Sequence, residues 1–147
     1  MKRLLLTPGL FLTSILSSCY RDSMREEIHS YLQEELAEIS HLEKEAIAAF
    51  ERVTGDHYTT DQELYNTLIY EVIPVYEIFL QQLERVELTS FRLQKIHEDC
   101  LNGVNLQYQA FASIAGALED LDKGKMVKAN SLLTDACKLI VCPYVYI

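Results

Sequence analysis

The segment TDQELYNTLIYEVIPVYEIFLQQLERV, residues 60–86, decides the fold class of this chain. Thr60 and Glu63 have the spacing of a capping box, in which two side chains satisfy free N–H groups of the first helical turn. Apolar residues then recur every three or four positions, which is the period of a helix and not of a strand. Pro74 lacks an N–H group and its ring crowds the preceding turn, so we expect a kink there. The segment predicts one kinked helix over about residues 61–86.

The apolar face of this predicted helix is wider than the face of about 100° that a surface helix usually buries. Its first stripe consists of Tyr65, Ile69, Val72, Tyr76, Phe79 and Leu83, and its second of Leu64, Leu68, Val75 and Ile78. Two interpretations stay open. Either the helix is central and packed on both sides, or the first stripe is a partner- or ligand-binding surface, with an apolar pocket at the Pro74 kink rimmed by tyrosines.

The same period predicts a long helix before this one and another after it. Residues 24–54 form an amphipathic pattern that we expect to stop at Gly55, a residue typical of helix ends. Residues from about 89 to 121 form the third long helix, with Asn102 and Gly103 as a weak point or bend within it.

A shorter helix is expected to complete the domain. Residues 122–125 form a tight turn, residues 126–140 have the helical period, and residues 141–147 suit an extended tail along the bundle. Short connections make neighbouring helices antiparallel. We therefore expect an all-α, up-down-up-down four-helix bundle with three long helices and a shorter fourth.

The first nineteen residues differ in character from the rest. Lys2 and Arg3 precede an apolar run from Leu4 to Leu16, and small residues follow at positions 17 and 18, just before Cys19. This is the basic, apolar, small-residue order of a secretory signal. The apolar run has 13 residues, whereas a helix that crosses a membrane needs about 20.

The tetrapeptide Leu16-Ser17-Ser18-Cys19 resembles the lipobox of bacterial lipoproteins. This resemblance implies that the thiol of Cys19 carries diacylglycerol and that the signal is cut just before it. Two or three acyl chains, such as palmitate, would then hold the protein persistently on a membrane, because each buried methylene contributes about 0.8 kcal/mol. The alternative is an ordinary signal with a chance cysteine. Residues 1–18 are thus expected to be a lipoprotein signal peptide, residues 19–22 a tether and residues 23–147 the helical-bundle domain.

The charge of the mature chain excludes some partners. Removing the signal takes away Lys2 and Arg3 and leaves 129 residues, with 11 basic and 22 acidic side chains and a net charge of −11. Such a surface repels nucleic-acid phosphates, and no basic stripe interleaved with aromatics is present, so we expect no nucleic-acid partner. Anionic lipid headgroups are repelled too, so the acyl anchor must supply the attachment.

The sequence offers no convincing catalytic or metal site. Helical bundles build metal sites from Glu-x-x-His pairs on facing helices, but Glu26/His29 and Glu38/His41 both lie on the first predicted helix. No nucleophile has a local base signature, and no glycine-rich phosphate loop is present. We therefore expect neither enzymatic activity nor a metal ion or other cofactor.

Three cysteines follow Cys19. If the last two helices fold back near Gly124, Cys142 lies about 9 Å from the level of Cys100, and Cys137 lies farther away. A disulfide needs Cα atoms within about 7 Å. Cys100–Cys142 is therefore the candidate disulfide, with Cys137 in the core; the alternative is three small buried thiols.

These features favour a lipid-anchored protein on the extracytoplasmic face of the cell membrane or outer membrane, acting as a non-catalytic protein-interaction or structural module. Tyr20 stands where lipoproteins of this kind usually carry Asp to stay on an inner membrane. Two alternatives remain. One is an apolar-ligand binding or sensing bundle with a pocket beside Pro74, and the other is an immunity or inhibitor lipoprotein whose acidic surface neutralises a basic toxin.

Overall fold

The computed structural model describes Ser23 and residues 25–140, and all the regular structure in this part of the chain is helical. Its principal helices are α2 (Ser40–Glu51), α3 (Asp61–Thr67), α4 (Ile73–Leu83), α5 (Phe91–Glu119) and α6 (Lys123–Ile140). The all-α prediction is confirmed. The expected order of lengths is not, because α6 has 18 residues and α2 only 12.

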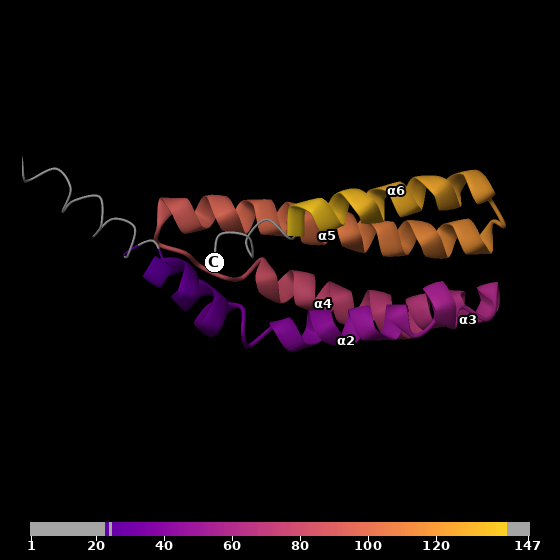
Figure 1. The fold of residues 1–147 in the computed structure, drawn as a ribbon, viewed down its shortest axis with the longest axis horizontal. Coiled ribbons are helices and arrows are strands. Elements are labelled where there is room, and N and C mark those ends of the chain that lie inside the picture. The colour runs from indigo at the N-terminus through magenta and orange to yellow at the C-terminus, as the bar shows by residue number, and fades with distance from the viewer. Residues whose placement is uncertain (1–22, 24, 141–147) are drawn as a thin grey trace, which may run out of the picture.

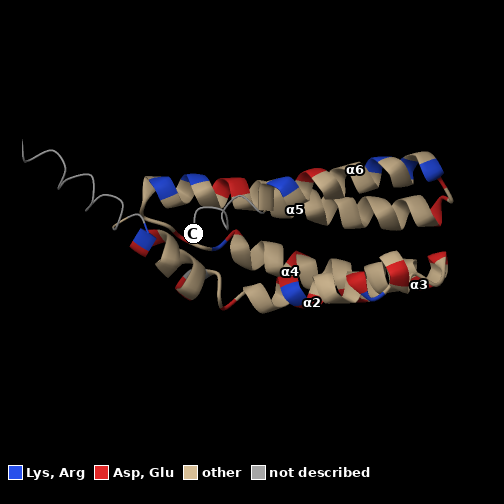
Figure 2. Cartoon of the chain, viewed as in Figure 1, with Lys and Arg blue, Asp and Glu red and all other residues tan. Residues whose placement is uncertain are grey.

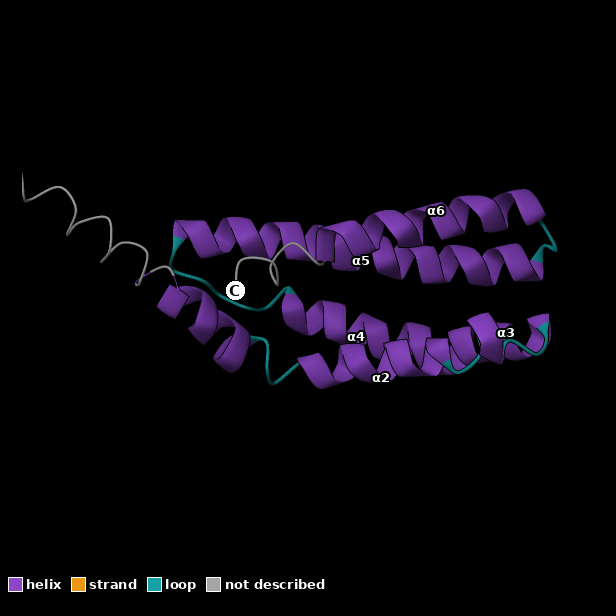
Figure 3. Cartoon of the chain, in the orientation of Figure 1, coloured by secondary structure: helices purple, strands orange, loops and turns teal. Residues whose placement is uncertain are grey.

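The helices run alternately in opposite directions (Figure 1). α2 and the α3–α4 run form one antiparallel pair, and α5 and α6 form another, with short loops at the two ends (Figure 3). The two pairs meet where α5 contacts α3, α4 and the turn between them.

The long first helix expected over residues 24–54 is interrupted. Residues 25–30 are α-helical, a π-helical turn η1 (Tyr31–Glu35) follows, and residues 36–39 form a turn before α2. The apolar residues on the two sides of this break have different neighbours. Ile28 and Tyr31 pack with Leu93 at the start of α5, whereas Ala46 and Ala49 pack in the main core. The break thus lies at the boundary between the two clusters, and sequence periodicity carries no information about this change of neighbour.

Gly55 does not end the first helix directly. α2 ends at Glu51, and Gly55 opens a short 3₁₀ turn, η2 (Gly55–His57). Gly55 has φ = +57°, in the left-handed region that glycine adopts at no steric cost. The helix therefore ends four residues before Gly55, which lies in the connecting loop.

The second helical run begins as predicted. The side-chain oxygen of Thr60 accepts a hydrogen bond of 3.1 Å from the backbone N–H of Glu63. The irregularity expected at Pro74 is a π-helical turn, η3 (Leu68–Val72), directly before α4. Pro74 lies in the first turn of α4, where a residue without an N–H group is tolerated. The run ends at Leu83 and not at residue 86.

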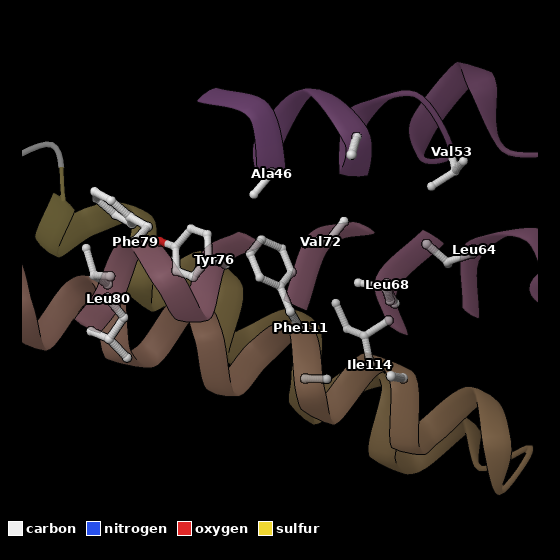
Figure 4. Packing of buried hydrophobic residues seen from close by; sticks show 14 of the residues in the cluster. Ala46, Val53, Leu64, Leu68, Val72, Tyr76, Phe79, Leu80, Phe111 and Ile114 are labelled. Atoms are coloured by element: carbon white, nitrogen blue, oxygen red, sulfur yellow. The ribbon is translucent and has the colours of Figure 1, made fainter. Parts of the chain in front are cut away.

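The main core lies between α2, the α3–α4 run and α5 (Figure 4). The ring of Phe111 lies 5.0 Å from that of Phe50 and 5.3 Å from that of Tyr76, between centroids. The hydroxyl of Tyr76 donates a 3.0 Å hydrogen bond to Oε1 of Gln107, and both residues are buried. This hydrogen bond satisfies two polar groups that would otherwise be costly in the core.

Gly103 is a point of close helix packing and not a break. α5 continues through it, and a Cβ atom there would lie 2.8 Å from Cγ1 of Ile140 and 3.1 Å from its backbone nitrogen. The missing side chain thus lets the end of α6 approach α5.

α6 begins at Lys123, inside the turn predicted over residues 122–125. The carboxylate of Asp122 accepts hydrogen bonds from the backbone N–H groups of Lys125 and Gly124, which hold its pKa below the usual value. Asp122 therefore caps α6 at its N-terminus. The apolar pattern predicts the start of this helix at residue 126, three residues later than Lys123.

Candidate functional site

The first apolar stripe of the second helical run is mainly core and not an open surface. Val72, Tyr76 and Leu83 are fully buried and Phe79 nearly so. The other two members, Tyr65 and Ile69, are half-buried against the same core. The interpretation of this stripe as a binding surface is therefore wrong, because α2 covers the run on one side and α5 on another.

The structure has an open recess on a different side of the run, and Pro74 is not among its lining residues. It lies between α2 and the η3–α4 junction, and we call it the Tyr70 groove. It is lined by Glu45, Ala48, Ala49, Arg52, Tyr70, Glu71 and Val75. Tyr70 is 74% exposed, unusually open for an aromatic residue at the centre of a helical run.

Local structure explains why the groove forms there. On the α2 side of the groove, Ala48 and Ala49 have small side chains that leave space between the longer side chains of Glu45 and Arg52. Tyr70 lies in the middle of η3, and a π-helical turn changes the direction of side chains relative to a regular helix and often occurs at functional sites. Neither apolar stripe includes Tyr70, so periodicity alone could not select it. The available signal was an aromatic residue on the polar side of the helix, four positions before a proline.

The groove carries an acidic balance. Nη2 of Arg52 donates hydrogen bonds of 2.9 Å and 2.8 Å to the two carboxylate oxygens of Glu71, and both side chains are about half exposed. No described residue forms a hydrogen bond or ion pair with the Glu45 carboxylate. One carboxylate in the groove is thus paired and the other is free.

A second recess lies where the N-terminal segment meets α4, α5 and the end of α6. Its lining is mainly apolar, and its polar members are Ser40, Glu43 and Cys100. The other lining residues are Leu32, Leu36, Phe79, Leu83, Val104 and Ile140. Burial raises the pKa of the Glu43 carboxyl, and it raises the pKa of the Cys100 thiol to about 11. The cavity volume is about 20 Å³, which is room for about one water molecule. This size does not favour a pocket for an apolar ligand.

The cysteine predictions have different outcomes. Cys100 is a buried free thiol, as a small core residue would be. Cys137 is exposed, so its predicted core position is wrong; α6 directs Ala129 and Ala136 inward instead. Cys142 lies outside the described residues, so the Cys100–Cys142 bridge stays a prediction. The lipidation site Cys19 also lies outside them.

One polar pair was not expected from the sequence. The hydroxyl of Tyr31 and Nδ1 of His97 are joined by a 2.8 Å hydrogen bond in a buried setting. Burial lowers the pKa of His97, while a hydrogen bond with the backbone of Leu83 opposes this shift. The pair connects the N-terminal segment to α5. A buried histidine held on both sides is typical of a structural role.

Within Ser23 and residues 25–140, no three His, Cys, Asp or Glu side chains are grouped so that they could hold a metal ion. His41 hydrogen-bonds the carbonyl of Glu38 on the protein surface.

No helix within Ser23 and residues 25–140 is both long and apolar enough to cross a membrane.

Comparison with known proteins adds no relative from which a function could be transferred. The chain matches no protein-family model, no curated protein and no solved structure.

Proposed function

We propose that this protein is a bacterial lipoprotein, anchored through Cys19 outside the cytoplasm, whose helical domain acts as a non-catalytic protein-interaction module. Support for the anchor comes from the sequence Leu16-Ser17-Ser18-Cys19 and the basic, apolar segment before it. The observation that carries the interaction role is the Tyr70 groove, an open recess with an exposed aromatic ring beside a tightly packed core.

The path of the chain supports a defined orientation in this proposal. Residues 19–22 are a tether that spans at most about 14 Å. Just beyond it, Glu27 accepts a 2.9 Å hydrogen bond from the hydroxyl of Ser90 at the start of α5. The bundle would therefore stand with this end at the membrane. α2 leads away from that end (Figure 1), so the Tyr70 groove, whose α2 wall runs from Glu45 to Arg52, would lie at a distance from the membrane.

Cys19→Ala tests the anchor. We expect the wild-type chain in the membrane fraction and in the detergent phase of a Triton X-114 separation, and Cys19→Ala as an uncut precursor without acyl chains. Cys137→Ala is the matched control, because it removes an exposed cysteine outside the lipobox. Identical partitioning and processing of wild type and Cys19→Ala would contradict the proposal.

The immunity or inhibitor function remains the second candidate, because the acidic charge of the mature chain suits a basic partner. The apolar-ligand function is less well supported. The recess with the more apolar lining is too small for such a ligand, and the Tyr70 groove carries charged side chains.

A further inference from the structure

The acidic charge of the domain is concentrated on one half of the bundle. Residues 40–90, which contain α2 and the α3–α4 run, carry ten acidic and three basic side chains. Residues 91–140, which contain α5 and α6, carry six of each. Figure 2 shows the same contrast, with blue segments more frequent on α5 and α6. A positively charged partner is therefore attracted to the half of the bundle that contains the Tyr70 groove.

The groove itself has two features that suit a cationic side chain. Glu45 offers a carboxylate that no described residue neutralises, and Glu71 is half exposed although it is paired with Arg52. The exposed ring of Tyr70 is a platform on which a Lys or Arg head group can be held by cation–π attraction. The small side chains of Ala48 and Ala49 leave room for the aliphatic stem of such a residue.

We propose that the Tyr70 groove binds a cationic peptide segment of the partner protein, with a Lys or Arg side chain between Glu45 and Glu71 and against the ring of Tyr70. This inference rests on the proposed interaction function and specifies the chemistry of its partner. An acidic segment is repelled by Glu45, and a neutral segment forms no ion pair with it.

The pairing of Arg52 with Glu71 gives the proposal a distinctive consequence. Arg52 supplies the positive charge inside the groove, so it competes with an incoming cation for the Glu71 carboxylate. Arg52→Gln should therefore tighten binding, whereas Glu45→Gln and Tyr70→Ala should weaken it. A variant that merely disturbed folding would not improve binding, so the opposite signs separate recognition from damage.

The test uses the full chain in a nonionic detergent at low ionic strength, with two fluorescently labelled probes. One is a hexapeptide of alternating lysine and leucine, and the other replaces every lysine with glutamate. By fluorescence anisotropy we expect binding of the lysine peptide only, weakened at least fivefold by Glu45→Gln and by Tyr70→Ala and tightened at least twofold by Arg52→Gln. Glu119→Gln, an exposed carboxylate on the neutral half, is the matched control and should change the Kd less than twofold. Helicity by circular dichroism confirms that each variant is folded.

Several results would overturn the inference. These are equal affinity for the two peptides, no binding of the lysine peptide at millimolar concentration, or equal weakening by Glu119→Gln and Glu45→Gln. Self-association lost in Tyr70→Ala, without peptide binding, would assign the groove to a second copy of the chain and also overturn it. Membrane attachment does not depend on Glu45 or Tyr70. Failure of the peptide test with normal Triton X-114 partitioning would therefore reject this inference and leave the anchor intact.

Discussion

Replacing Gly116 with alanine should stabilise the protein, whereas the same substitution at Gly103 should give a less stable variant than Gly116→Ala. Both glycines lie inside α5, where an alanine is favoured over a glycine by about 1 kcal/mol. A Cβ atom at Gly116 meets nothing within 4 Å, so the full gain should appear there. At Gly103 the new atom would lie 2.8 Å from Cγ1 of Ile140, well inside the usual carbon–carbon contact distance of about 3.5–4.0 Å.

The cost at Gly103 cannot be relieved by a side-chain rotation alone. The backbone nitrogen of Ile140 would be only 3.1 Å from the new atom, so α6 itself must shift. Overpacking of this kind costs about 1–3 kcal/mol. The intrinsic helix preference is common to both variants, so the difference between their unfolding free energies should equal this cost.

Urea unfolding followed by circular dichroism measures that difference directly. We expect Gly116→Ala to be more stable than Gly103→Ala by about 1–3 kcal/mol, with a matching difference of several degrees in Tm. Variants of equal stability, or a Gly103→Ala variant more stable than Gly116→Ala, would refute the close approach of α5 and α6.

Three further predictions concern buried groups. Tyr76→Phe leaves the amide oxygen of Gln107 without its donor and should lower the free energy of unfolding in urea by about 1–3 kcal/mol. Adding Gln107→Leu should recover part of that loss. A Tyr76→Phe variant as stable as the wild type would argue against the hydrogen bond. Burial lowers the pKa of His97 below the ordinary 6.5, so its contribution to stability is complete above pH 6.5 and is lost as the pH falls below it. The stability difference between wild type and His97→Gln should therefore shrink between pH 7.5 and pH 5, and a constant difference would contradict this. Under reducing conditions iodoacetamide should modify the exposed Cys137 much faster than Cys100, because burial raises the pKa of the Cys100 thiol to about 11. Equal modification rates, measured by peptide mass spectrometry, would show that Cys100 is accessible.

Local signals in the sequence predicted the helices well and their partners less well. The capping pair Thr60 and Glu63 located the start of the second run, and hydrophobic periodicity located α5. The break at residues 36–39 escaped prediction because apolar residues on both sides of it keep the same period while they belong to two different hydrophobic clusters. Periodicity indicates which side of a helix is buried, but it does not indicate which residues that side packs against.

The register of the last two helices was also mispredicted. A turn centred near Gly124 would place position 145 opposite Gly103, whereas the structure places Ile140 there. The difference arises because Asp122 caps α6 at Lys123, three residues earlier than expected, so the chain reverses sooner. A short turn of this kind depends on one side-chain cap, which a pattern of apolar residues does not reveal.

The candidate site could be predicted only in part. The wide apolar face drew attention to the second run, but the central-helix interpretation is the one that the burial of Tyr76 and Leu83 supports. The open surface is instead made by Tyr70 and by α2, which are distant in the sequence. A groove between two helices depends on their relative rotation, and that rotation is set by packing across the whole core.

The intact mass of the protein extracted from the membranes of bacteria that produce it tests the proposed lipid anchor. We expect a chain that begins at Cys19 and carries the added mass of diacylglycerol, with or without a third acyl chain. A chain that is uncut, or cut at another position, and that carries no acyl group would contradict it.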